Sequence, residues 1–430
     1  MLMLRLWNFL VPLGLALGIA CCGKGPPPGG SAEGEVRPDA GYRAPAASAP
    51  AAADASAAAD AGAAAAPNAS ATTEAPIGGP VRLSMSEGGL CGIWADGSAR
   101  CWGKSTPEPG GSSAAPTTQA ELLPIQAVWT TALGLHHRCV LMREGIVRDA
   151  ALSLQNTGCH LRYVTKVSKV EQLVMGRGGF CARLVNGEVT CWMVDSSEGG
   201  FPYVPTKVPD LRDVVEVAAG ASHMCALRRN GVVWCWGQNI TGQLGDGTFK
   251  GEGHPDNRKT PLPVVGLRHV KHIALGYAHS CAIVSSGDVF CWGDNWGDEL
   301  GTGVKLDSQD SPGPPRKDDL NNLTARPRPG KVAALSHAVE LALPGQSSCA
   351  RTLDGKVYCW GGYLGSRPNR AMPSLVEGLD GVVQIVSAPN VGLVCVLLQG
   401  GETRCWGENE FGVFGENPRK FVARPRRISW

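Results

Sequence analysis

The sequence is short of charge: Asp, Glu, Lys and Arg make up only 18% of its 430 residues, and the formal net charge is +2. Nucleic-acid-binding proteins usually carry a strongly basic face, so this balance argues against a broad polyanion-binding surface. The body of the chain also lacks the 3.6-residue apolar spacing that helical repeats need. We therefore expect no nucleic-acid partner and no helical solenoid.

Motifs for catalysis and for cofactor binding are missing as well. The chain contains no Gly-x-Ser-x-Gly elbow, no phosphate-binding loop and no dinucleotide fingerprint. Close cysteine pairs of the Cys-x2-Cys kind, which typically hold zinc, do not occur after residue 22. We therefore expect no catalytic residue, no cofactor and no metal site. Carboxylates that come together only in the folded chain would escape this search.

Glycine, proline and cysteine are abundant by contrast, with 57, 31 and 16 residues respectively. The glycine and proline content suits many short strands joined by turns. So many cysteines are unusual in a reducing cytosol, and they indicate an oxidising compartment or metal sites.

The first twenty residues have the form of a secretory signal. One positive charge, Arg5, precedes an apolar core from Phe9 to Ala20 that is too short to span a membrane. Small residues then lead into Cys21, and the segment resembles the lipobox of bacterial lipoproteins, although Leu17 stands one position earlier than in that pattern. We predict a signal peptide over residues 1–20 and lipidation of Cys21. The alternative is a plain cleaved signal and a secreted protein.

Residues 21–80 differ from the rest in composition. They are rich in Pro and Gly and then in Ala, and they contain almost no large apolar side chain. Such a segment buries too little surface to offset the entropy lost on ordering. We predict a disordered tether, whose r.m.s. reach as a flexible coil is roughly 40 Å.

Seven related segments follow in residues 81–430. Each contains two cysteines, and the first cysteines of successive pairs are 42 to 68 residues apart. Repeats of about 40 to 50 residues that consist of short strands are typical of β-propeller blades. The period-two alternation around Cys225 and Val232–Trp236 favours strands. We therefore predict an all-β fold with seven blades over residues 81–430.

The spacing of the cysteines indicates how they pair. In six segments they are ten residues apart and flank a small or polar residue followed by Gly, as at Asn230-Gly231. A three-residue hairpin loop with left-handed Gly would place the two cysteines opposite each other, at a Cα distance of about 4.5–5.5 Å. The second segment has ten extra residues between its cysteines. The predicted disulfides are Cys91–Cys101, Cys139–Cys159, Cys181–Cys191, Cys225–Cys235, Cys281–Cys291, Cys349–Cys359 and Cys395–Cys405.

The segments after the second cysteines resemble a known repeat. The segments Trp236–Gly245, Trp292–Gly301 and Trp406–Gly415, together with Gly220–His223 and Gly276–His279, look like the regulator-of-chromosome-condensation repeat. This resemblance implies a seven-bladed β-propeller with four antiparallel strands per blade, and binding across one of its faces. The final residues, Arg424–Trp430, have no cysteine pair after them, and we expect them to complete the first blade.

Other candidate sites have simpler interpretations. His137, His223 and His279 share one repeat position, two residues before a first cysteine, and we predict that they bond backbone groups rather than a metal. The long inserts 249–264 and 302–334 are expected to be solvated loops available for partner contacts. The second insert lacks the ordered oxygen spacing of an EF-hand. The basic run 419–427 is expected to be a solvated strand edge.

We therefore predict a non-catalytic, monomeric scaffold at the cell envelope. It would bind an unidentified protein or surface polymer, and the lipid on Cys21 would anchor it to the membrane. The alternative is a propeller enzyme that acts on cell-surface glycans. The founding nuclear member of the family is a nucleotide exchanger for a small GTPase, an activity that suits an exported protein poorly. Secreted bacterial relatives include a protein inhibitor of β-lactamase, which is closer in type.

Overall fold

The computed structural model describes residues 78–86, 89–103, 121–123, 127–133, 138–149, 167–176, 179–193, 205–249, 257–303, 325–362, 370–414 and 421–430. The predicted signal peptide, Cys21 and the predicted tether up to residue 77 lie outside these ranges, as do His137 and Cys159. Residues 250–256 of the first long insert and 304–324 of the second lie outside them too. The prediction of solvated loops is wrong for the described parts of both inserts, because Asn257–Pro263 and Ala325–Lys331 form the outer strands of two sheets. No helix among the described residues is long and apolar enough to cross a membrane.

All regular structure in the described residues is β-strand, arranged in antiparallel sheets with the strands in chain order. The first sheets are β1 (Arg82–Ser86), β2 (Gly89–Ile93), β3 (Ala99–Gly103), β4 (Glu121–Leu122); β5 (Val128–Leu133), β6 (Arg138–Met142), β7 (Val147–Asp149); and β8 (Val170–Gly176), β9 (Gly179–Leu184), β10 (Val189–Met193), β11 (Thr206–Lys207). The next are β12 (Val214–Ala219), β13 (His223–Arg228), β14 (Val233–Gln238), β15 (Asn257–Pro263); and β16 (Val270–Leu275), β17 (His279–Val284), β18 (Val289–Asp294), β19 (Ala325–Lys331). The last are β20 (Ala338–Ala342), β21 (Ser347–Thr352), β22 (Val357–Gly361), β23 (Arg370–Leu375); and β24 (Val382–Ala388), β25 (Val391–Leu398), β26 (Thr403–Glu408), β27 (Phe421–Arg427).

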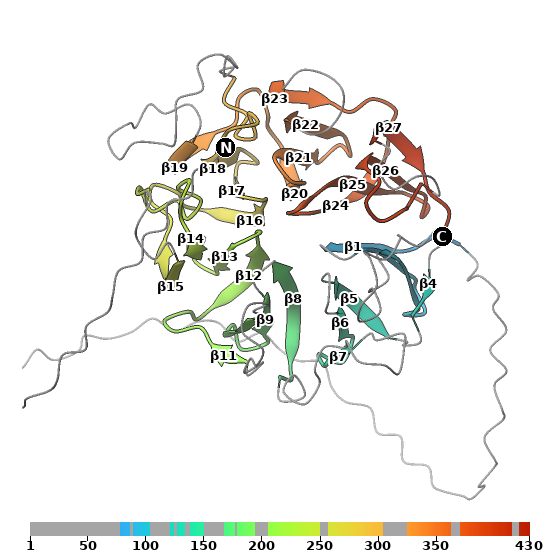
Figure 1. Ribbon diagram of the computed structural model, residues 1–430, viewed down its shortest axis with the longest axis horizontal. Coiled ribbons are helices and arrows are strands. Elements are labelled where there is room, and N and C mark those ends of the chain that lie inside the picture. The colour runs from blue at the N-terminus through green and yellow to red at the C-terminus, as the bar shows by residue number, and fades with distance from the viewer. Residues whose placement is uncertain are drawn as a thin grey trace, which may run out of the picture. The chain divides into compact units, whose positions relative to one another are not determined.

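The sheets surround a common centre, to which each contributes its first strand (Figure 1). Strand β1 contacts both β5 and β24, so the first and last sheets meet and the ring closes. Six sheets, rather than the predicted seven, have four strands, and the sheet around Cys139 has three among the described residues. The β-propeller and its four-stranded blades are as predicted. The structure therefore shows six four-stranded blades where seven were predicted; residues 150–166, which follow β7 in the seventh sheet, lie outside the described ranges.

Tight hairpins join the second and third strands of the sheets, as the sequence predicts. At one of them Gly231 N donates to Arg228 O at 2.8 Å, and Arg228 N donates to Val232 O at 2.9 Å, which leaves a three-residue loop. Gly231 has φ of 77°, and a Cβ there would lie 3.0 Å from His269 Cα of the next sheet. Glycine is therefore needed both for the left-handed backbone and for the close approach of the neighbouring blade.

The hairpins bring the cysteines together. Six predicted disulfides are present, and each joins directly opposed residues of a second and a third strand at a Cα distance of 4.0–4.1 Å. In the β5–β7 sheet the residue opposite Cys139 is Asp149, where the other sheets have the second cysteine. The cross-strand geometry predicted for Cys139–Cys159 therefore does not hold in this register. Cys159 itself lies outside the described residues, so that pair stays a prediction.

The hydrophobic core lies between neighbouring sheets. Trp292 of β18 packs with Leu244 and Val264 of the preceding sheet, and Trp360 of β22 packs likewise against Leu300 and Val332. Both indoles are fully buried. Truncation of a buried Trp typically costs about 3–5 kcal/mol, so this recurring position contributes much of the blade-to-blade stability.

The C-terminal strand does not complete the first blade, contrary to the prediction. It is β27, and it pairs with β26 at the outer edge of the last sheet. The residues after it do reach the first sheet, because the Trp430 indole packs over Gly92 and edge-on against Trp94 at 5.7 Å. Alternating residues cannot reveal which sheet receives an edge strand, and this is why the sequence misplaced it.

Candidate functional site

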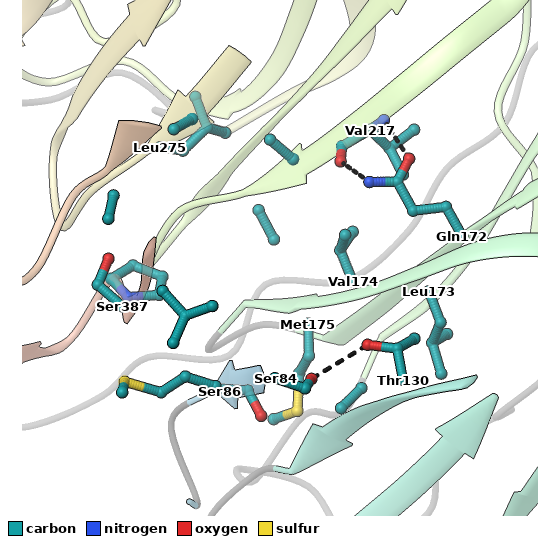
Figure 2. Close-up of a pocket in the computed structure, with 18 of the residues that line it drawn as sticks. Ser84, Ser86, Thr130, Gln172, Leu173, Val174, Met175, Val217, Leu275 and Ser387 are labelled. Carbon is teal, nitrogen blue, oxygen red and sulfur yellow. Dashed lines mark hydrogen bonds between the residues drawn. The ribbon is translucent and has the colours of Figure 1, made fainter. Parts of the chain in front are cut away.

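A cavity of about 370 Å³ lies on the propeller axis and is lined by the first strands of all seven sheets. Figure 2 shows its wall, where apolar side chains such as Val174, Met175 and Leu275 alternate with the hydroxyls of Ser84 and Ser387. Polar groups contribute at least as much of the lining as apolar ones, and Arg82, Glu171 and Glu216 bring charge to it.

Side chains beside this cavity join neighbouring blades at four places around the ring. The Gln172 amide donates to Val217 O and accepts from Val217 N, both at 2.9 Å (Figure 2), and Gln384 bonds Leu83 N and O in the same way. Glu216 accepts from Ile273 N, and Glu340 accepts from Ile385 N. We call these four contacts the inter-blade clasps. The clasp between Gln384 and Leu83 joins the last sheet to the first.

A β-bulge aims the clasp side chains. The register shifts between Val214 and Glu216, and equivalent shifts precede Gln172, Glu340 and Gln384. A bulge puts one extra residue into the strand and turns the next side chain out of the sheet. The repeated pattern of an apolar residue, any residue, a polar residue and an apolar residue could have revealed these positions in the sequence. The sequence analysis did not single them out.

Charged groups at the cavity are paired with neighbours. Glu216 Oε1 lies 2.7 Å from His272 Nδ1, Glu171 pairs with Arg183, and the Arg82 guanidinium stacks 3.7 Å above the Trp129 ring. Burial disfavours the charged imidazole of His272, but the charge and hydrogen bond of Glu216, together with the charge of Glu340, raise its pKa above the ordinary value. Glu216 with His272 and Arg82 with Trp129 thus form contacts between neighbouring sheets, whereas Glu171 with Arg183 forms an ion pair within one sheet.

His223 and His279 bridge blades through serine side chains, a contact that the sequence did not predict, and His279 also has a backbone hydrogen bond with Ser347. His223 Nε2 lies 2.9 Å from Ser280 Oγ of the next sheet, and His279 Nε2 lies 3.0 Å from Ser348 Oγ. Ser280 and Ser348 donate to the carbonyls of Gln243 and Glu299, so each serine oxygen is left to accept from the imidazole. Burial lowers the pKa of both histidines to about 3. No group of three potential metal ligands occurs in the described part of the chain.

Loops after the third strands carry the glycine-rich segments singled out in the sequence. In three of them an asparagine closes the loop: Asn239 Oδ1 accepts from Leu244 N and Asn295 Oδ1 from Leu300 N, both at 3.0 Å, and Asn409 Oδ1 accepts from Phe414 N at 3.2 Å. Thr241 Oγ1 donates to Ala278 O at 3.1 Å and so links this loop to the next sheet. We call residues 239–245 and 295–301 the exit loops. They are fixed platforms for the side chains between their anchor points.

Three large hydrophobic side chains are exposed at this end of the blades. Ile240 and Trp296, at equivalent places in the exit loops, are 42% and 57% exposed, and Tyr277 between them in the chain is 44% exposed. Tyr277 is next to Ala278, which accepts the bond from Thr241, and its own N–H donates to Gly345 O at 3.2 Å. We call these three side chains the exit surface. Exposed Trp and Tyr on rigid loops are typical anchors of protein–protein interfaces.

The basic C-terminal run lies at a sheet edge, as expected. Arg424, Arg426 and Arg427 belong to β27 or its end, and all three are exposed. The run does not gather with the exit surface, because β27 is the outermost strand of the last sheet.

Comparisons with known proteins point to one repeat type. Two models of the Regulator of chromosome condensation (RCC1) repeat match residues 214–243 and 230–283. The chain is 29% identical over 256 residues to the E3 ubiquitin-protein ligase HERC2 of Homo sapiens, a match that covers 54% of this chain and 5% of the ligase. It is 26% identical over 263 residues to the Ultraviolet-B receptor UVR8 of Arabidopsis thaliana, which covers 57% of this chain and 55% of the receptor.

Solved structures resemble the fold. Yeast RCC1 (Prp20), solved bound to Kap60, has a TM-score of 0.54 at 18% identity and covers 81% of this chain and 74% of its own. Human WBSCR16 has a TM-score of 0.55 at 18% identity, with 76% and 89% covered. At such identities the likeness concerns the fold alone.

Proposed function

We propose that this chain, a β-propeller of regulator of chromosome condensation repeats, is a non-catalytic scaffold that binds another protein outside the cytoplasm. The observation that carries the proposal is the exit surface, where Ile240, Tyr277 and Trp296 are exposed on loops held by hydrogen bonds. Burial of such side chains in a partner's pockets would supply most of the binding free energy. The yeast relative solved bound to Kap60 offers a precedent for a protein ligand.

The disulfides support an extracytoplasmic place. Six hairpins are stapled by disulfides that are almost entirely buried, and such bonds persist in oxidising compartments. We further propose that residues 1–20 direct export, that Cys21 receives a lipid, and that residues 21–77 tether the propeller to the membrane. Mass spectrometry of the mature amino terminus tests this: an acylated Cys21 supports the anchor, and a mature chain that starts elsewhere without lipid contradicts it.

Site-specific photo-crosslinking in intact cells tests the binding proposal. A photoreactive residue in place of Tyr277 or Trp296 is expected to give one or a few discrete adducts. The matched control is Leu353, which is 77% exposed in the hairpin loop between β21 and β22, at the opposite end of the blades. The adduct should disappear from the Tyr277 position when Trp296→Ala is introduced. Equal adducts from all three positions, or none from the exit surface, would refute the proposal.

A further inference from the structure

A second cavity, of about 610 Å³, lies where the first and last sheets meet. We call it the seam cavity. Its walls come from the residues before β1, the loop after β2, strand β3, the β25–β26 hairpin, and the end of β27 with the residues after it. The backbones of Gly79 and Gly401 touch there so closely that a Cβ on Gly79 would lie 2.1 Å from Gly401 O. The hairpin places this cavity at the opposite end of the blades from the exit surface.

Two indoles form the apolar side of the seam cavity. Trp94 and Trp430 meet edge to face with ring centroids 5.7 Å apart. Their N–H groups are engaged, because Trp94 Nε1 donates to Gly78 O and Trp430 Nε1 donates to Thr403 Oγ1, both at 3.0 Å. These bonds fix the rings and leave their carbon surfaces to line the space, which favours a flat or ring-shaped body in the cavity.

The charge of the cavity wall is not balanced. Arg100 and Arg427 both line it, and among the described residues neither guanidinium has a carboxylate partner. Arg100 Nε is buried without a hydrogen-bond acceptor, and this guanidinium lies 5.9 Å from the Trp94 ring centroid. The carboxylate in the same wall, Glu402, already accepts from Arg404 Nε at 2.6 Å. Two unpaired guanidinium groups beside one cavity call for an anion, and the planar fork of Arg suits a carboxylate.

We propose that the seam cavity binds a small carboxylate carried on a six-membered ring. Arg100 and Arg427 bind the carboxylate, while Trp94 and Trp430 contact the ring. A uronate sugar and an aromatic acid share this chemistry. The site is separate from the exit surface, so its ligand does not depend on the proposed protein partner.

Titration followed by NMR tests the proposal, with the Trp430 indole N–H as reporter and Trp430→Phe to assign its signal. The probes are glucuronate and benzoate, each against its neutral counterpart, glucose and benzamide. At least one acid is expected to shift the signal saturably at concentrations up to about 10 mM, where small ligands of this size bind. Saturation by glucuronate alone assigns a sugar, and saturation by benzoate alone assigns an aromatic acid. No saturation by either acid, or equal binding of the neutral counterparts, overturns the proposal.

Matched variants separate the site from general surface charge. Arg427→Gln removes an exposed guanidinium from the wall and is expected to weaken binding about tenfold, the loss that one charge-assisted pair represents. Arg424→Gln makes the same change in charge on the same strand, outside the cavity, and is expected to leave affinity unchanged. Equal weakening by both variants overturns the proposal. Arg100→Gln should act like Arg427→Gln, and unchanged chemical shifts elsewhere would show that the variant folds.

Discussion

At the scale of single residues, buried titratable groups decide how the propeller responds to pH. Glu299 is 1% exposed, and burial together with the charge of Asp294 raises its pKa well above the ordinary value. In the preceding exit loop the same place is taken by Gln243, whose Oε1 accepts from Thr241 N just as Glu299 Oε2 accepts from Gly297 N. The repeat thus offers a neutral version of the same contact.

We therefore expect Glu299→Gln to stabilise the protein above pH 5. A carboxyl with a raised folded-state pKa stays protonated in the fold while the unfolded chain ionises, so stability is lost as pH rises above the unfolded-state pKa of about 4.5. The variant removes that loss, and at pH 8 its free energy of unfolding should exceed the parent's by the order of 1 kcal/mol. Urea denaturation at pH 5 and pH 8 measures it. The reciprocal change, Gln243→Glu, should destabilise, and the idea fails if both variants match the parent at pH 8.

The buried histidines act at acid pH. His223 and His279 have a pKa of about 3 in the fold, below the ordinary value, because burial disfavours the charged ring. Between the unfolded-state pKa of about 6.5 and pH 3 the unfolded chain binds protons that the fold does not, so stability falls as pH falls. Each histidine is expected to contribute a slope of about 1.4 kcal/mol per pH unit in that range. Unfolding free energies of the double variant His223→Gln/His279→Gln from pH 6 to pH 4 should show a shallower slope, and an unchanged slope would assign the acid sensitivity elsewhere.

At the scale of the element, the hairpin is the unit that the sequence predicts best. Spacing and turn residues at Asn230-Gly231 determine the loop, the register and the disulfide, and all three are local. The β5–β7 sheet has the same turn at Gly145, yet Asp149 lies opposite Cys139, so the ten-residue register does not apply there. Cys139 is disulfide-bonded, and its predicted partner Cys159 lies outside the described residues. The glycine-rich sequence of the exit loops allowed us to single them out in advance. The inter-blade clasps depend on a β-bulge, and no turn residue signals its position.

One stapled hairpin provides a test at this scale. The double variant Cys225→Ala/Cys235→Ala removes a disulfide between two fully buried cysteines that are ten residues apart. Without the disulfide the unfolded chain has more conformational entropy, so the free energy of unfolding is expected to fall by about 2–3 kcal/mol. Chemical denaturation under oxidising conditions measures it. The reduced parent should lose more of its free energy of unfolding, since all its disulfides are then open. A double variant as stable as the parent would show that this disulfide does not stabilise the fold.

At the scale of the whole molecule, closure of the ring is the weakest inference from sequence. Which sheet edge receives Phe421–Arg427 depends on contacts between residues hundreds of positions apart, such as Gln384 with Leu83. Alternation along one strand carries no information about a distant partner. The cavities share this limit, because Arg100 and Arg427 come together only once the first and last sheets meet.

Closure can be weakened by one substitution. Gln384→Ala leaves Leu83 N–H and C=O without partners at the junction of the first and last sheets. Loss of partners for part-buried backbone groups predicts a destabilisation of about 2 kcal/mol. Gln172→Ala removes the same bonds between two consecutive sheets and is the matched control. Amide hydrogen exchange at Leu83 should accelerate in Gln384→Ala but not in Gln172→Ala. Equal protection in both variants would show that the junction of the first and last sheets does not open by itself.

The six disulfides described above each lie within one hairpin, and none of them joins two blades. For a chain that crosses a membrane unfolded, amino terminus first, this arrangement sets the order of oxidation. In these six hairpins the first cysteine meets its partner ten residues later, as soon as that short loop emerges and long before the ring exists, because local loops close fastest. Correct pairing then needs no proofreading between distant cysteines, and the blades reach the assembly of the ring already oxidised.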